Sequence, residues 1–203
     1  MKLWFRLGET RMADVSKSVK TLRAFWKDRQ AEIDGDALFE EMKGTSDRAV
    51  VIVLGAFMDD ALQFVLARLF RRMPDAEYET AFGPNGPLGP FSSRIDMAYW
   101  LSAIDEKTRE KLHDLRELRN ACAHSKRSIS FKDKALANVA KRVIGKTGMT
   151  PLESDTPIGI RNTLITDIFL EFNFLVHGRD VTFAMVKEAA ARHRAEAENG
   201  GAA

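Results

Sequence analysis

The sequence predicts an all-α fold, a single-domain bundle of several helices with one Gly/Pro-rich connection between two of them. Apolar residues recur with the period of an α-helix along nearly the whole chain, and no pair of alternating segments indicates a β-hairpin. Glycine and proline gather in the segment 82–94, which cannot be helical until its end. A chain of 203 residues is long enough to bury one well-packed core.

The expected helices follow from this period and from the residues that start and stop helices. In chain order they span residues 14–31, 37–42, 48–73, 94–104, 106–124, 129–146, 160–176 and 182–199. The segment 34–36 breaks the first helix, and the segment 44–47 supplies an N-cap and an acidic first turn for the third. Ser92 or Ser93 is expected to cap the fourth helix, and Asp105 the fifth.

The helix over 48–73 is expected to be the central buried one, because its first half is apolar on all sides. Gly55 costs this helix about 1 kcal/mol relative to alanine, which predicts that a neighbouring helix approaches closely there. The core helical domain is expected over 45–146. An N-terminal helical extension precedes it over 1–44, and C-terminal helices over 147–203 pack on it and end in a frayed tail.

The segment "GPNGPLGP" over 83–90 predicts a rigid connection between helices. A phosphate-binding loop is disfavoured there, because no strand precedes it and no lysine follows its glycines in the required pattern.

Bulk composition excludes several classes of protein. The net charge of +2 is too small to indicate nucleic-acid binding from overall charge. The single Cys122 excludes a disulfide framework within one chain and a zinc site of several thiolates. The longest apolar run, 49–58, is about half the length that spans a bilayer, and the N-terminus lacks the features of a signal peptide. We therefore expect a cytoplasmic protein without a membrane segment, cofactor or metal.

The helix over 106–124 carries the candidate functional residues on distinct faces. At about 100° per residue, one side should face the core and is formed by Leu112, Leu115, Leu118 and Cys122. A polar row on nearly the opposite side is formed by His113, Arg116, Asn120 and His124. Arg119 lies nearer the apolar side and therefore needs a carboxylate, for which Asp59 or Asp60 on the central helix is the natural candidate.

The stretch "LRELRNACAHS" over 115–125 contains an arginine and a histidine five positions apart, with a polar residue directly after the arginine. Five residues on one helix separate side chains by about 140° and about 7.5 Å along the axis, so Arg119 and His124 do not converge by themselves. Asn120 and His124, four apart, do converge. A site of all three residues needs a helix end or bend near Ala123, or a second copy of the helix across a dimer axis.

This pattern resembles the motif of the HEPN superfamily, whose active members are metal-independent ribonucleases. In that chemistry the 2′-hydroxyl of the RNA attacks the adjacent phosphate. The resemblance implies that Arg119 holds the phosphate, His124 acts as general acid or base and Asn120 orients the groups. The motif is short, and an arginine and a histidine at this spacing occur by chance in many helices.

A longer resemblance covers roughly residues 40–145. The segments 45–62, 82–104 and 112–125, in that order, are similar to the mannitol operon repressor family. The resemblance implies an all-α bacterial regulator without a recognisable helix-turn-helix. Members share the Arg-Asn and Ala-His pattern at the end of this helix, which leaves open that the HEPN-like motif is inherited scaffold.

Local charge gives a separate hypothesis. The segment from Arg119 to Lys146 has eight basic residues and one acid, Asp133, a net charge of +7. Such a face can neutralise phosphates, and the expected contacts are Lys126, Arg127, Lys132, Lys134, Lys141 and Arg142. A solvated basic helix is the other reading, since no interleaved aromatics indicate single-strand stacking and no segment forms a recognition helix.

Three functions therefore stay open. The first is a regulator of the mannitol-operon-repressor type, expected to be a homodimer that acts through a protein partner or through phosphate contacts. The second is a HEPN-type endoribonuclease that uses Arg119, Asn120 and His124, as a toxin or defence effector would. The third is a helical interaction module with neither activity.

Overall fold

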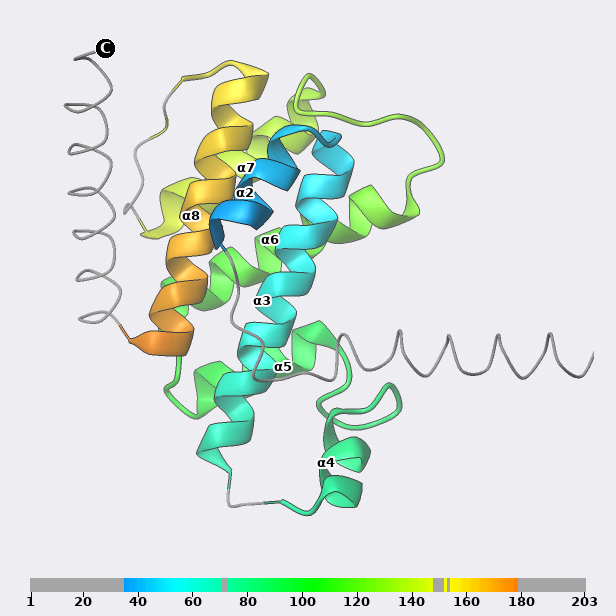
Figure 1. Ribbon diagram of the computed structural model, residues 1–203, viewed down its shortest axis with the longest axis vertical. Coiled ribbons are helices and arrows are strands. Elements are labelled where there is room, and N and C mark those ends of the chain that lie inside the picture. The colour runs from blue at the N-terminus through cyan, green and yellow to red at the C-terminus, as the bar shows by residue number, and fades with distance from the viewer. Residues whose placement is uncertain (1–34, 71–72, 148–151, 153, 179–203) are drawn as a thin grey trace, which may run out of the picture. The chain divides into compact units, whose positions relative to one another are not determined.

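A computed structural model describes residues 35–70, 73–147, 152 and 154–178 (Figure 1). Every regular element within these ranges is a helix, which confirms the all-α prediction. The helices are α2 (Gly35–Lys43), α3 (Asp47–Leu69), α4 (Asp75–Phe82), α5 (Phe91–Trp100), α6 (Glu106–His124), α7 (Lys134–Thr147) and α8 (Pro157–His177). The helices expected over 14–31 and 182–199 lie outside the described residues.

Helix α3 is the central helix, as the sequence predicts. Ser46 caps it by accepting a hydrogen bond from the Ala49 amide at 3.2 Å. It packs against α5, α6 and α8, and its buried side chains include Val50, Leu54 and Leu62. These contacts remove apolar surface from water along most of the helix and are the main source of core stability.

Helix α3 is also the one helix of the described ranges that is long and apolar enough to cross a membrane by length and composition. The apolar run 49–58 is part of this longer helix, which continues past Asp59 and Asp60. Its packing against three other helices is the arrangement of a core helix, and Asp59 forms an ion pair on its flank.

The Gly/Pro-rich segment forms a compact connection of tight turns. The amides of Gly86, Leu88 and Gly89 donate to the carbonyls of Gly83, Ala81 and Gly86 at 2.9, 2.9 and 3.0 Å. A Cβ at Gly86 would lie 2.2 Å from the Thr80 carbonyl oxygen, so the backbone packs too closely for any side chain there. These contacts agree with the expected rigid connection between helices.

Several helix boundaries differ from the sequence prediction. Helix α4 was not predicted, and α5 begins at Phe91 after Pro90 rather than after Ser92 or Ser93. Helix α7 begins at Lys134 rather than at 129, because residues 130–133 form a turn in which Asp133 accepts from the Ser130 amide at 3.0 Å. At α7, a side-chain bond to the local backbone thus delays the start of the helix.

Candidate functional site

The core-facing side of α6 is the one that the sequence predicts. Leu112, Leu115, Leu118 and Cys122 are all at most 2% exposed. Burial raises the pKa of the Cys122 thiol from 9.0 to about 11. His124 is exposed at the end of the opposite row, while Asn120 is half-buried.

Arg119 packs against α3 at Gly55. A Cβ at position 55 would lie 2.8 Å from the Arg119 Cδ and 3.0 Å from its Cβ and Cγ. The glycine therefore leaves room for the arginine stem, and the predicted close approach of a neighbouring helix at Gly55 is confirmed. The aliphatic part of the arginine gains apolar contact there while its guanidinium can reach more polar surroundings.

Asp59, one of the two carboxylates expected beside Arg119, pairs with a different arginine. Arg94 Nη1 donates to Asp59 Oδ1 at 2.6 Å, and the same guanidinium donates to the carbonyls of Leu88 (2.7 Å) and Phe82 (3.2 Å). In place of the pair between Arg119 and Asp59 that the sequence suggested, Arg94 occupies Asp59 and fixes the Gly/Pro-rich connection to α3.

Arg119 still acts on these carboxylates at longer range. Burial raises the pKa of Asp59, against the opposing charges of Arg94 and, more weakly, Arg119. Burial also raises the pKa of Asp60, with repulsion from Asp59 as a second cause, while Arg94 and Arg119 oppose it. Arg119 is thus a long-range counter-charge to both aspartates.

The HEPN-like motif does not converge within one chain. Helix α6 runs unbroken through His124, and the Ser125 amide closes it by donating to the Ala121 carbonyl at 3.0 Å. A bend or a helix end before His124, either of which could bring Arg119 towards it, is absent: α6 ends only after His124. Arg119 is directed to Gly55, whereas His124 is exposed, so a site that uses both needs a second copy of the chain.

Residues 125–134, which we call the basic loop, follow His124 and end at Lys134, the first residue of α7; they are held by the start of α3. Arg48 Nη2 donates to the Ser125 carbonyl at 3.1 Å and to the Arg127 carbonyl. Asp47 accepts from the Phe131 amide at 2.9 Å and from Arg161 at 3.0 Å. The loop is thus attached to the bundle at both its beginning and its end.

The basic residues expected to contact phosphates fall into two groups. Exposed side chains that form no ion pair with a carboxylate of the described residues are Lys126, Arg127, Lys132 and Lys134. The two residues farther along α7 are paired: Lys141 lies 2.9 Å from Asp155, and Arg142 forms a bidentate pair with Asp114 at 2.5 and 2.6 Å. Within the described residues, only the side chains of the first group can bind an anion without first breaking an ion pair.

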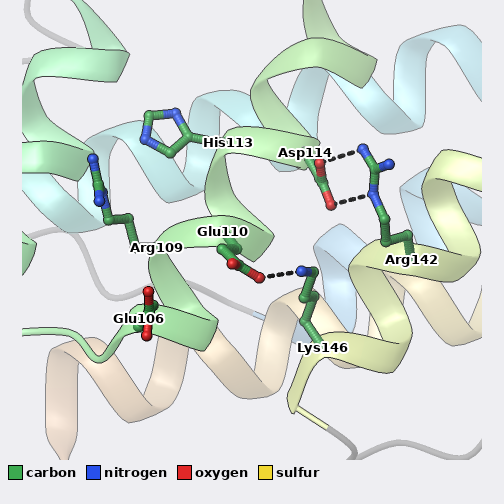
Figure 2. Close-up of a pocket in the computed structure, with 7 residues that line it drawn as sticks. All are labelled: Glu106, Arg109, Glu110, His113, Asp114, Arg142 and Lys146. Atoms are coloured by element: carbon green, nitrogen blue, oxygen red, sulfur yellow. Dashed lines mark hydrogen bonds and ion pairs between the residues drawn. The ribbon is translucent and has the colours of Figure 1, made fainter.

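A shallow pocket of about 340 Å³ lies between α6 and α7 (Figure 2). Figure 2 shows Arg142 and Lys146 of α7 pointing to Asp114 and Glu110 of α6. The Lys146 hydrogen bond lowers the pKa of Glu110, and the Asp114 hydrogen bonds raise the pKa of Arg142. Because these charges are paired with one another, the main role of the pocket wall is to hold α6 and α7 together through two ion pairs.

A second charged cluster joins α5 to α6. Arg109 donates to Asp96 at 2.7 and 2.9 Å, and His113 lies 3.3 Å from the same oxygen. Partial desolvation opposes ionisation of Asp96, but the hydrogen bonds from Arg109 and His113 outweigh it and lower its pKa. The Arg109 guanidinium also lies 4.8 Å from the centre of the Tyr99 ring, next to the exposed end of α5.

The end of α5 exposes two large apolar side chains. Trp100 is 67% exposed and Leu101 is 43% exposed; we call them the Trp100–Leu101 patch. Their exposure was not predicted, because period alone does not distinguish an exposed tryptophan of an amphipathic helix from a buried one.

Sequence reasoning also missed a buried ionic cluster. Lys111 is fully buried, with its ammonium 2.8 Å from Asp167 and 2.9 Å from Glu171 of α8. Thr108 donates to Glu171 at 3.4 Å. The sequence did contain a signal for this cluster. Lys111 precedes Leu115 by four residues and therefore lies on the apolar side of α6. Asp167 and Glu171 likewise lie within the apolar run of α8.

Within the described ranges, no group of three or more His, Cys, Asp or Glu side chains is placed to hold a metal ion.

Comparisons with known proteins give one informative result. No family model and no curated protein matches the sequence. Among solved structures, the chain matches one in the X-ray structure of the MtlR-HPr complex from Escherichia coli, with a TM-score of 0.57 and 18% identity. The match covers 70% of this chain and 98% of that chain. At this identity the likeness shows a shared fold.

Proposed function

We propose that this chain is a transcriptional regulator of the mannitol-operon-repressor type, which acts in the cytoplasm by binding another protein. The observation that carries the proposal is the shared fold, which covers 98% of the matched chain from the MtlR-HPr complex. The sequence resemblance supports the same family. Its three segments form α3, the Gly/Pro-rich connection with α5, and α6, and these three helices pack against one another.

The partner proposed for this chain is a small protein of the HPr kind, because the matched structure is a complex with HPr. The Trp100–Leu101 patch is the proposed anchor. Tryptophan is among the residues that most often dominate protein interfaces. Here the exposed Trp100 directly follows Tyr99, whose ring centre lies 4.8 Å from the Arg109 guanidinium. A partner would cover apolar surface that water now contacts.

The test is calorimetric titration of the full chain with HPr from Escherichia coli and with HPr from the organism that this sequence comes from. We expect the wild type to bind, and we expect Trp100→Ala to raise the Kd at least about tenfold, because that is the usual effect of removing an interface anchor. Ile158→Ala is the matched control, because Ile158 is equally exposed at 66% but lies at the start of α8. If neither HPr binds at concentrations up to about 100 µM, the proposed partner is refuted. A Kd at that limit corresponds to a binding free energy of about −5.5 kcal/mol.

The regulator is further proposed to be a homodimer. Light scattering coupled to size exclusion should then give twice the chain mass of 22.8 kDa. If the measured mass is that of a monomer at about 50 µM chain, the proposed homodimer is refuted, whereas the proposed binding of HPr is unaffected.

A metal-independent endoribonuclease is the second candidate, favoured by one observation: His124 is exposed directly before the free cations of the basic loop. His124 would serve as general acid or base, Asn120 would orient the groups, and Arg119 from a second copy would stabilise charge on the phosphorane. The geometry within one chain does not complete this site.

Cleavage of varied RNAs in EDTA tests this candidate. Products with 2′,3′-cyclic phosphate ends that are lost in His124→Ala and kept in His177→Ala would support it. His177 is the matched control, because it too is exposed at the C-terminal end of a helix. Lack of cleavage by the wild type would count against the nuclease.

A further inference from the structure

The basic side chains over 126–134 differ from those farther along α7 in having no carboxylate partner. Lys126, Arg127, Lys132 and Lys134 are exposed within nine consecutive positions, and none pairs with a carboxylate of the described part of the chain. Lys141, Arg142 and Lys146, farther along α7, each pair with a carboxylate. The four unpaired cations, with Asp133 as the one acid among them, form a local positive field that attracts anions.

The loop is also held in place before any ligand arrives. Arg48 binds two of its backbone carbonyls, and Asp47 accepts from the Phe131 amide at 2.9 Å. Inside the loop, Ser125 Oγ donates to the Arg127 carbonyl at 3.0 Å and accepts from its amide at 3.3 Å. Because the backbone is fixed, a ligand needs to order only the ends of the basic side chains, which lowers the entropy lost on binding.

The loop has charge but no apolar anchor. Its one aromatic residue, Phe131, is 2% exposed and belongs to the core, and Ile129 is half-buried. The exposed large apolar side chains of the described residues, Leu69, Trp100, Leu101 and Ile158, all lie outside the loop. A protein partner would need an apolar centre to its interface, and single-stranded nucleic acid would need an exposed ring for stacking.

We propose that the basic loop binds the phosphate backbone of a nucleic-acid duplex, without reading its sequence. Lys126, Arg127, Lys132 and Lys134 supply the phosphate contacts. Charge alone is enough for this contact, because cations that neutralise phosphates release condensed counterions into solution. The inference goes beyond the proposed function: it concerns a different surface from the Trp100–Leu101 patch and stands or falls independently of HPr binding.

Four phosphate contacts give a defined salt dependence. The logarithm of the binding constant should fall with the logarithm of salt concentration with a slope of about −3.6, and raising NaCl from about 50 to about 200 mM should weaken binding about a hundredfold. The affinity itself should be that of non-specific binding, about 1–100 µM at physiological salt.

Fluorescence anisotropy of the full chain with labelled 20-bp duplexes of random sequence tests this. DNA and RNA duplexes are titrated separately to distinguish the source of the phosphates, together with a single strand of the same length. The test variant is Lys126→Ala/Arg127→Ala/Lys132→Ala/Lys134→Ala, and Lys132→Ala/Lys134→Ala is a milder second variant. Arg142→Ala/Lys146→Ala is the matched control, because it removes two cations that already have carboxylate partners.

We expect the quadruple variant to keep the wild-type melting temperature and lose at least tenfold in affinity for a duplex, with its salt slope close to zero. The double variant should lose about half the slope, since each phosphate-contacting lysine accounts for about one unit of it. The control should keep the wild-type slope. No duplex binding by the wild type at 50 mM NaCl, or equal binding by the quadruple variant, overturns the proposal. Loss of HPr binding with duplex binding unchanged would assign the loop to a protein interface and overturn it as well.

Discussion

Replacing Lys111 by methionine should destabilise the protein more than any surface change on α6. The ammonium is buried between two carboxylates, and the side-chain exposures of Lys111, Asp167 and Glu171 are 0%, 0% and 6%. Methionine has nearly the same length, so the change removes the charge while leaving little cavity. Two acidic groups then stay buried without this cation, and removing one partner of a buried ion pair costs about 3–5 kcal/mol.

A loss of that size is a large share of the roughly 5–15 kcal/mol that stabilises a typical domain. At about 2–4 °C per kcal/mol for a chain of this length, the melting temperature should fall by about 6–20 °C. Urea unfolding followed by far-UV circular dichroism measures the free energy directly.

Lys107→Met is the matched control for this experiment, because Lys107 lies one turn earlier on α6 and is exposed. It should change the free energy of unfolding by less than about 0.5 kcal/mol. The triple variant Lys111→Met/Asp167→Leu/Glu171→Met should recover most of the loss, since an apolar replacement of a whole buried ionic cluster is often neutral. If Lys111→Met alone stays within about 1 kcal/mol of the wild type, the cluster does not have the energetic role assigned to it.

Two further predictions concern other parts of the chain. Gly86→Ala should destabilise the folded protein by about 1–3 kcal/mol or more, because its Cβ would lie 2.2 Å from the Thr80 carbonyl oxygen. Gly145→Ala should instead stabilise the folded protein by up to about 1 kcal/mol, because a Cβ there meets nothing within 4 Å and alanine favours the helix. Thermal melts of the two variants should shift in opposite directions, and equal shifts would contradict the tight-turn geometry. The pKa of Cys122 is raised from 9.0 to about 11, so its thiol keeps its proton as pH rises through 9. At pH 8 its thiolate fraction is therefore about a hundredfold below that of an unperturbed thiol. A disulfide reagent at pH 8 should therefore label the native chain at least a hundredfold more slowly than the chain in guanidinium, and rapid native labelling would show that the thiol is accessible.

Periodic features were readable from the sequence because they are local. The apolar side of α6 and the central position of α3 follow from which side chains recur every three to four residues, and a helix places such residues on one face in any environment. Gly55 was informative for a similar reason: a glycine in a buried helix has a cost that close packing offsets, and Arg119 supplies that packing.

Helix boundaries were less predictable where side chains compete for the backbone. Asp133 and Ser130 delay the start of α7 in this way. Helix α5 is a different case, because it begins directly after Pro90 with no side-chain cap, ahead of the serines that were expected to cap it. Such competition depends on a few hydrogen bonds near one end of a helix, which periodicity does not report.

By itself, the sequence determined that the chain is helical, which face of α6 enters the core, and where α3 meets a neighbour. Only the tertiary structure decided the partners of the charges: Arg94, from 35 positions away, takes Asp59, and Lys111 meets Glu171 from 60 positions away. Ion pairs form between groups that folding brings within a few ångströms, and that distance is unrelated to separation along the chain. For the same reason the sequence counted one basic segment, whereas the structure separates the paired cations of α7 from the free ones of the basic loop.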